Sequence, residues 1–242
     1  MENLKINMEQ ELILRKKLAA ACHVLAKEGH ADNVLGHLSI RIEPDAFLMK
    51  PRGFGLEEVS AEDMIIINLE GQKVSGKHAP HNEIPIHTEI FRVRPDVQCV
   101  VHTHPLHSIA FSATGEDLKP LSNDGCIFWP GVPRFIQMTD LIYTKEQGKL
   151  LAECLGDRRA VLMVGHGITV VGGSVEEATV SAIYLEKTAQ IQLMVMHRED
   201  YSYTPDEEAS LKQKRIFVQT KIIEKWKYYL RKWGEKEVEG LE

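Results

Sequence analysis

The stretch Cys99-Val100-Val101-His102-Thr103-His104-Pro105 joins an apolar, β-prone run to two histidines separated by one residue. This pattern predicts a buried strand that ends in polar side chains. Side chains at positions i and i+2 of a strand point to the same face, so His102 and His104 are presented side by side, with Cα atoms about 7 Å apart. Two imidazoles at this spacing can bind one ion, and imidazole favours Zn, Fe, Co, Ni or Cu over Mg or Ca.

Two other segments carry residues of metal-binding type. Glu83 lies just ahead of a helical pattern that ends at Arg94-Pro95, although the helix dipole alone would favour a carboxylate there. His166 interrupts an apolar run between two glycines, which permit an unusual backbone and the close approach of another group. Three histidines and a glutamate predict an open, catalytic metal site, because closed structural zinc sites are usually cysteine-rich.

The bulk properties are those of one globular domain over residues 1–242, with 43% hydrophobic and 26% charged residues. A net charge of −6 argues against nucleic acid and anionic membranes as partners. We expect no membrane-spanning segment and no signal peptide, and hence a cytoplasmic protein. The four cysteines are widely spaced, which predicts reduced thiols and argues against cysteine ligands for the metal.

The order of the predicted elements indicates an α/β fold. Helices are expected over about 8–27, 83–94, within 139–155, over 174–196 and over about 205–233, with one more after Pro105. Short strands are expected near 38–42, 47–50 and 64–68. We therefore predict an α/β/α sandwich with a mostly antiparallel central sheet. A doubly wound parallel sheet is less favoured, because strands cluster early in the chain and no glycine-rich dinucleotide loop is present.

Over roughly residues 10–200 the chain resembles the class II aldolase/adducin family. The resemblance rests on the order and spacing of five blocks: Gly36-His37-Leu38-Ser39-Ile40-Arg41, Pro51-Arg52-Gly53, Glu83 with His87, His102-Thr103-His104-Pro105, and His166-Gly167. This family includes L-fuculose-phosphate aldolase, ribulose-5-phosphate 4-epimerase, hydroxyaryl-carboxylate decarboxylases and the non-enzymatic adducin head domain.

The resemblance implies a role for each metal-binding candidate. One divalent ion would be held by His102, His104 and His166, with Zn²⁺ favoured and Mn²⁺, Fe²⁺ or Co²⁺ as alternatives. Glu83 would be the catalytic acid/base and would also ligate the metal when substrate is absent. Adducin-like members typically lack this glutamate, so its presence favours an enzyme.

Family members often complete the site with a tyrosine from a neighbouring subunit's C-terminal segment. Carried over to this chain, this implies a catalytic Tyr228 or Tyr229 and a homotetramer with active sites at its interfaces. Trp226, Tyr229 and Trp233 also have the spacing of a buried helix stripe, so packing is the competing interpretation.

The chain departs from the sugar-phosphate members of the family at the blocks that cradle phosphate. Those members carry small residues where this chain has His37, Arg52 and the pair His81-Asn82, and Lys50 lies close by. A planar arginine fork matches a carboxylate bidentately. We therefore expect a small anionic substrate, bound by His37, Lys50, Arg52 and Asn82.

These replacements resemble the decarboxylase branch of the family, which acts on aromatic or heteroaromatic acids with an ortho hydroxyl. The expected activity is that of a metal-dependent carbon–carbon lyase that decarboxylates such an acid through a metal-stabilised enolate. Phe128 and Trp129 are either an aromatic wall of the site or ordinary core residues. The alternative function is a sugar-phosphate aldolase or 4-epimerase, because arginine also binds phosphate. A non-catalytic adducin-like binding domain is less favoured.

Overall fold

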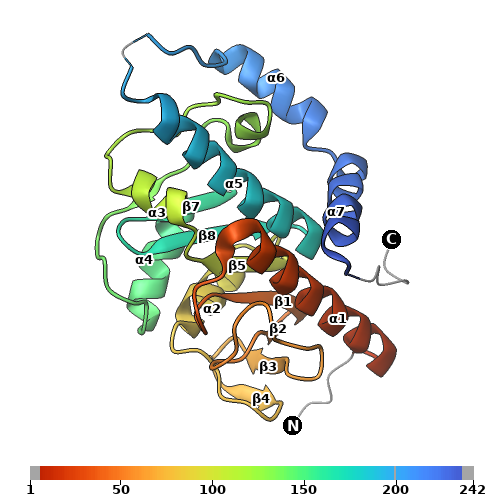
Figure 1. The fold of residues 1–242 in the computed structure, drawn as a ribbon. Helices are drawn as coiled ribbons and strands as arrows, with labels where there is room; N and C mark the ends of the chain where they lie inside the picture. Colours follow the sequence, from red (N-terminus) through yellow and green to blue (C-terminus); the bar gives the residue numbers. More distant parts are fainter. Residues whose placement is uncertain (1–5, 199, 236–242) are drawn as a thin grey trace.

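The computed structural model describes residues 6–198 and 200–235, and within them the strands form one eight-stranded sheet of order β4-β3-β2-β1-β5-β8-β7-β6 (Figure 1). Every neighbouring pair is antiparallel except β6 with β7. The strands are β1 His37–Glu43, β2 Ala46–Met49, β3 Ile65–Asn68, β4 Lys73–Ser75, β5 Cys99–Thr103, β6 Arg134–Phe135, β7 Ala160–Met163 and β8 Gly167–Gly172. The mostly antiparallel sheet confirms the predicted fold class.

Helices cover both faces of the sheet (Figure 1). The α-helices are α1 Met8–Leu25, α2 Ile84–Val93, α3 Leu106–Ser112, α4 Lys145–Leu155, α5 Val175–Val195, α6 Asp206–Ile216 and α7 Gln219–Trp233. Two short turns of helix, η1 Ala26–His30 and η2 Asp124–Phe128, complete the order. One hydrophobic core lies between the sheet and α1, α3, α5 and α7, and a second lies between the sheet and α2 with α4. The three layers form the expected sandwich. No helix in the described part of the chain is long and apolar enough to cross a bilayer.

The alternation of side chains along the central strands decides which face carries polar groups. In β5, Cys99 and Val101 enter the core beneath α1 and α5, whereas Val100 enters the core beneath α2. His102 follows with the parity of Val100 and therefore points toward α2. The strand register then places His37 of β1 and Thr169 of β8 directly opposite His102. A polar row thus crosses the middle of the sheet on the α2 side.

The C-terminal region differs from the single helix that the sequence predicts over 205–233. Two helices, α6 and α7, are separated at Phe217 and Val218, and Val218 has an extended backbone with φ −119° and ψ 149°. The Phe217 ring packs against the guanidinium of Arg159, with Cζ 3.7 Å from the ring centroid. This contact explains the break, because it draws Phe217 toward the sheet and away from a continuous helix.

Candidate metal centre

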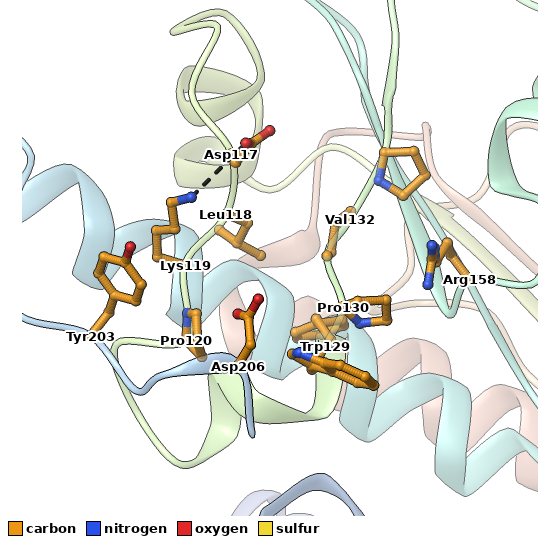
Figure 2. A pocket seen from close by; sticks show the side chains of 14 residues that line it. Asp117, Leu118, Lys119, Pro120, Trp129, Pro130, Val132, Arg158, Tyr203 and Asp206 are labelled. Carbon is orange, nitrogen blue, oxygen red and sulfur yellow. Dashed lines mark ion pairs between the residues drawn. The ribbon is translucent and has the colours of Figure 1, made fainter. Parts of the chain in front are cut away.

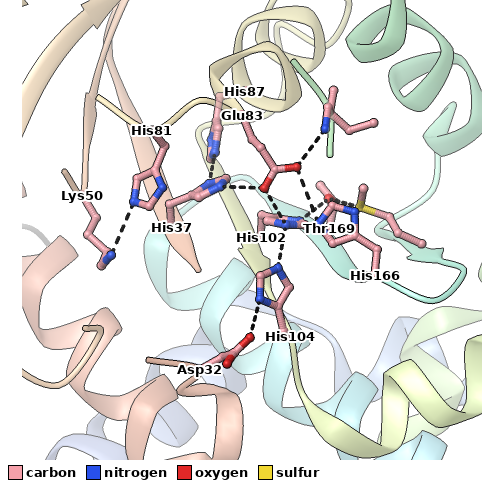
Figure 3. Close-up of polar contacts among 12 residues, drawn as sticks. Asp32, His37, Lys50, His81, Glu83, His87, His102, His104, His166 and Thr169 are labelled. Atoms are coloured by element: carbon pink, nitrogen blue, oxygen red, sulfur yellow. Dashed lines mark hydrogen bonds and ion pairs between the residues drawn. The ribbon is translucent and has the colours of Figure 1, made fainter. Parts of the chain in front are cut away.

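Glu83, His102, His104 and His166 converge at one point of the structure (Figure 3). Each offers one ligand atom, and these atoms all lie within 4.8 Å of one another. Glu83 immediately precedes α2, His102 and His104 lie at the end of β5, and His166 lies in the turn between β7 and β8. Segments far apart in the sequence are therefore joined at the carboxyl end of one central strand.

The turn that carries His166 depends on its flanking glycines. Gly165 has a positive φ of 67°, a backbone conformation that residues with a Cβ rarely adopt. At Gly167 an added Cβ would lie 2.5 Å from the carbonyl oxygen of Thr103 and 2.6 Å from Cδ2 of His104. Glycine at this position allows β8 to approach the end of β5 closely enough to place His166 beside His104.

The outer nitrogens of two histidines have partners that fix their orientation. His104 Nδ1 donates to the Asp32 carboxylate at 3.0 Å. His102 Nδ1 lies 3.2 Å from Thr169 Oγ1, whose own hydrogen is directed to the sulfur of Met163. With Nδ1 donating in both rings, each Nε2 presents a lone pair, and the two Nε2 atoms lie only 3.1 Å apart. Such lone pairs repel one another unless a cation lies between them.

The Glu83 carboxylate is held in place by one backbone donor. The amide of Ile142 donates to its Oε1 at 2.9 Å, and Oε2 lies 3.6 Å from His102 Nε2. Burial alone would raise the pKa of Glu83, but its contacts with His166 and His37 hold that pKa well below its usual range. Glu83 is therefore an anion among imidazoles.

The three histidines around this anion offer ring nitrogens as ligands. Burial lowers the pKa of His102 well below its ordinary value, and burial beside His166 also lowers the pKa of His104. His166 Nε2 is buried without a hydrogen-bond partner among the residues described and lies 3.5 Å from Glu83 Oε1. Three imidazoles and one carboxylate fit a divalent transition-metal ion of the catalytic type.

A basic cluster adjoins the metal centre on the side of β1 and β2 (Figure 3). The His37 ring lies 4.4 Å from the His81 ring, and His81 Nε2 lies 3.5 Å from Lys50 Nζ. Lys50 is fully buried, and burial lowers its pKa to about 8. Arg52 is exposed and donates to the side-chain oxygen of Asn82 at 3.2 Å. The structure therefore groups His37, Lys50, Arg52 and Asn82 beside Glu83, although their role in binding stays a prediction.

The two C-terminal tyrosines lie on α7. In the part of the chain described, they make no contact with the four candidate metal ligands. Tyr229 packs against the hydrophobic core, whereas Tyr228 is 51% exposed. Trp226 is buried, as expected for a packing stripe. A role for Tyr228 or Tyr229 would require a second subunit.

Several other aromatic and histidine side chains do not belong to the group of four candidate ligands. Phe128 is a core residue, and Trp129 lines a separate cavity of about 420 Å³ between the 117–133 segment and the start of α6 (Figure 2). His107 Nδ1 binds Glu186 at 2.7 Å, not a metal-facing histidine. His87, four residues after Glu83, hydrogen-bonds His37 instead of Glu83.

Sequence reasoning missed Asp32 and Thr169, the two residues that orient the histidine pair. Asp32 lies in a polar loop and Thr169 in an apolar strand, so neither stands out from its neighbours. Only the strand register and the path of the loop bring them to the site.

Comparisons with known proteins identify the family to which this chain belongs. Residues 16–193 match the family described as Class II Aldolase and Adducin N-terminal domain. The 3,4-dihydroxyphthalate decarboxylase of Arthrobacter keyseri is 35% identical over 196 residues, which cover 75% of this chain and 78% of that protein. The decarboxylase tropJ of Talaromyces stipitatus is 30% identical over 92% of this chain and 93% of its own length. Among solved structures, an L-fuculose 1-phosphate aldolase from Glaciozyma antarctica superposes with a TM-score of 0.83 at 26% identity, covering 96% of this chain and 93% of that one. The chain belongs to the class II aldolase and adducin N-terminal domain family, which confirms the resemblance noted in its five sequence blocks.

Proposed function

We propose that this protein is a metal-dependent lyase that decarboxylates a hydroxylated aromatic or heteroaromatic carboxylate. The similar proteins named above include decarboxylases, and the decarboxylase NovR of Streptomyces niveus is also 29% identical to this chain. The observation that carries the proposal is the basic cluster of His37, His81 and Lys50 beside the four converging side chains. A buried cation and imidazole donors suit the carboxylate and hydroxyl oxygens of such an acid.

The three histidines would hold one divalent ion, with Zn²⁺ favoured because imidazole and carboxylate ligands in a three-histidine site suit it. The ion would supply Lewis acidity that stabilises negative charge on the substrate oxygens. With the histidines as ligands, Glu83 would be free to act on the substrate. The amide of Ile142 holds its Oε1, and its Oε2 faces His37 and His102.

Glu83 would act as the acid/base of the reaction. Its carboxylate takes the proton of the substrate hydroxyl and delivers it to the ring carbon that bears the carboxylate. The bond between this carbon and the carboxylate then breaks, CO₂ leaves, and the electron pair restores the aromatic ring with negative charge on the former hydroxyl oxygen. That oxygen regains a proton from solvent, so the reaction consumes one proton overall.

Lys50 and Arg52 would bind the end of the substrate remote from the reacting carbon. Lys50 is buried and donates to the carbonyls of Val34 and Pro51 at 3.4 Å, and the described contacts include no carboxylate partner within ion-pair distance. Arg52 and Asn82 lie further out, where their polar groups could orient an anionic substituent.

We propose further that the chain acts as a homotetramer in which Tyr228 or Tyr229 completes a neighbour's site. The exposure of Tyr228 supports this assignment, because its ring is available to another subunit. We place the protein in the cytoplasm, where its four free cysteines would remain reduced.

A thermal-shift experiment on the zinc-loaded protein separates the proposed function from its alternative. One arm uses a panel of ortho-hydroxyaryl carboxylates that includes 3,4-dihydroxyphthalate, and the other uses a hydroxamate mimic of a sugar-phosphate enediolate. A ligand at a hundredfold excess over its Kd stabilises the native state by about 2.7 kcal/mol.

A shift with the aryl acids, followed by CO₂ release, supports the decarboxylase. A shift with the phosphate mimic alone would instead support an aldolase or epimerase, which the fuculose-phosphate aldolase fold also favours. Equal shifts in EDTA-treated protein would contradict a role for the metal in binding. Protein that binds no metal would point to an adducin-like binding domain.

A further inference from the structure

His104 lies outside the strand that carries the other histidine of its pair. Strand β5 ends at Thr103 and helix α3 begins at Leu106, so only His104 and Pro105 connect the two elements. The pairings of β5 with β1 and β8 include His102 but not His104. Pro105 has φ −71°, the angle that its ring imposes, so the connection is stiff as well as short. The position of His104 therefore depends on where α3 begins.

The start of α3 has no cap of its own. The first N–H groups of a helix have no partner within the helix, and a Ser, Thr, Asp or Asn side chain at the N-cap usually accepts from the second or third residue. In α3 the N-cap is Pro105, whose side chain has no acceptor. The donors that need a partner are the backbone N–H groups of His107 and Ser108, and Ser108 is fully buried. A buried N–H without a partner is costly, so an acceptor must come from elsewhere.

Glu186 of α5 supplies the missing acceptors. Its Oε1 accepts the backbone N–H of His107 at 2.9 Å, and its Oε2 accepts that of Ser108 at 2.8 Å. The side chains of the same two residues also bind the carboxylate, each at 2.7 Å, through His107 Nδ1 and Ser108 Oγ. Because a backbone N–H can only donate, the direction of the first two bonds is fixed. The Glu186 side chain is 12% exposed, so water competes little for these contacts.

Helix α5 holds Glu186 in the core. Leu185, which precedes it, and Ala189, three residues after it, are fully buried, and α5 packs against both α3 and β5. This helix covers the face of the sheet opposite α2, and Glu186 is not among the four side chains that converge on the metal centre. Its effect on His104 is therefore transmitted through the main chain at Pro105.

We propose that Glu186 is a positioning residue of the metal centre, which caps α3 and thereby sets the place of His104 relative to His102 and His166. This inference rests on the metal binding that forms part of the proposed function. Without the carboxylate, the N–H groups at the start of α3 must turn toward other acceptors, and the connection that carries His104 moves with them. Metal–ligand distances vary by only about 0.2 Å, so a small displacement of one ligand lowers the affinity for the ion.

The test compares the zinc affinity of two variants, measured without substrate by competition with a chelator of known affinity. Glu186→Gln keeps the size of the side chain but turns an amide NH₂ toward one of the two backbone N–H groups. Glu177→Gln is the matched control on the same helix. Glu177 is 19% exposed, accepts the backbone N–H of Gly173 at 3.2 Å and pairs with Arg159, and it is not one of the converging side chains. Urea unfolding of the metal-free proteins gives the stability of each variant.

We expect both substitutions to lower stability, because each removes a charge-assisted hydrogen bond from a partly buried carboxylate. Only Glu186→Gln should also weaken zinc binding, by about tenfold, as the loss of other groups that orient a ligand does. Equal zinc affinity in Glu186→Gln and Glu177→Gln would overturn the proposal, because Glu186 would then have a structural role alone.

A second comparison tests whether Glu186 acts through the helix cap. Pro105→Ser places a side-chain oxygen at the N-cap of α3, where it can accept from the same two N–H groups. Glu186→Gln should therefore cost less zinc affinity in the Pro105→Ser background than in the wild type, as a double-mutant cycle measures. Equal losses in the two backgrounds would contradict the cap. If Pro105→Ser does not fold, the comparison of Glu186→Gln with Glu177→Gln still decides the question.

The same measurements separate this inference from the proposed function. Weaker zinc binding by Glu186→Gln alone supports the positioning role even if no aryl acid is decarboxylated, and in that event only the proposed substrate fails. Decarboxylation by the wild type, together with equal zinc affinity in the two variants, would retain the function and reject the role of Glu186. Wild-type protein that binds no zinc would overturn both.

Discussion

The Asp32 carboxylate lies 3.0 Å from His104 Nδ1 and so turns the opposite nitrogen of this ring toward His102. Asp32 belongs to the loop between η1 and β1, and its side chain is 37% exposed. A metal-binding histidine commonly donates its second N–H to a carboxylate in this way, which fixes the tautomer and increases the basicity of the ligand.

Replacing Asp32 with alanine should weaken metal binding about 10- to 100-fold, because His104 would lose its orienting partner. Competition with a chelator of known affinity measures the change. The control is Asp157→Ala, since Asp157 is 89% exposed and its ion-pair partner is Arg158, not a candidate ligand. Equal metal affinity in both variants would show that Asp32 does not orient His104.

Glu83→Gln should retain the metal but lose at least about 100-fold in kcat, because glutamine cannot carry a proton between substrate atoms. The three histidines remain as ligands, and the Ile142 amide can still donate to the side-chain oxygen of glutamine. Metal content by elemental analysis and CO₂ release measured together test this prediction. Full activity in a metal-loaded Glu83→Gln protein would assign the acid/base role to another residue.

Gly167→Ala should lower both stability and metal affinity. The added Cβ would lie 2.5 Å from the Thr103 carbonyl oxygen and 2.6 Å from the His104 ring, so β8 or the His104 ring must move. Overpacking of this kind costs about 1–3 kcal/mol of unfolding free energy. Urea unfolding and metal titration give the two quantities.

Gly173→Ala is the control for this substitution. Gly173 follows the far end of β8, and a Cβ there would meet only the flexible end of Glu177, at 3.3 Å. Its metal affinity should equal that of the wild type. Unchanged metal affinity in Gly167→Ala as well would mean that the close approach of β8 to His104 is not needed for binding.

The metal-free protein should lose stability as the pH falls below neutrality. Burial lowers the pKa of His30 to about 4, whereas an unfolded histidine has a pKa of about 6.5. Between these values the unfolded chain binds a proton that the folded chain does not, so the stability present above about pH 6.5 decreases toward pH 4. Each such histidine contributes up to about 1.4 kcal/mol per pH unit in this range.

His30→Asn tests this dependence. Asparagine removes the titrating group and keeps a polar atom near Thr103 Oγ1, which His30 Nδ1 contacts at 2.9 Å. Urea unfolding at pH 7 and pH 5 should therefore give a smaller difference in unfolding free energy for the variant. A pH dependence identical to that of the wild type would show that His30 is not a source of the acid sensitivity.

Local sequence patterns predict the parts of the site that depend on local geometry. The alternation that ends in His102 and His104, and the glycines around His166, identify side chains that the structure does bring together with Glu83. Their function as ligands stays a prediction. The family and the sandwich fold could also be predicted from the sequence, because both follow from the order of short local segments along the chain.

The partners of these side chains could not be predicted in the same way. Thr169 meets His102, and His87 meets His37, only through the pairing of distant strands and the docking of α2 on the sheet. The break between α6 and α7 was missed because no proline or glycine marks it. It follows from the packing of Phe217 on Arg159, a contact between distant segments.

Because β5 lies between β1 and β8, the four candidate ligands converge only when the central strands have paired, so metal binding depends on complete folding. The candidate ligands meet only after β5 has paired with β8 and α2 has docked, so a chain that has not completed these steps lacks the full donor set. Ion binding then adds free energy to the finished fold alone. Chains that have not yet folded would therefore bind the metal weakly.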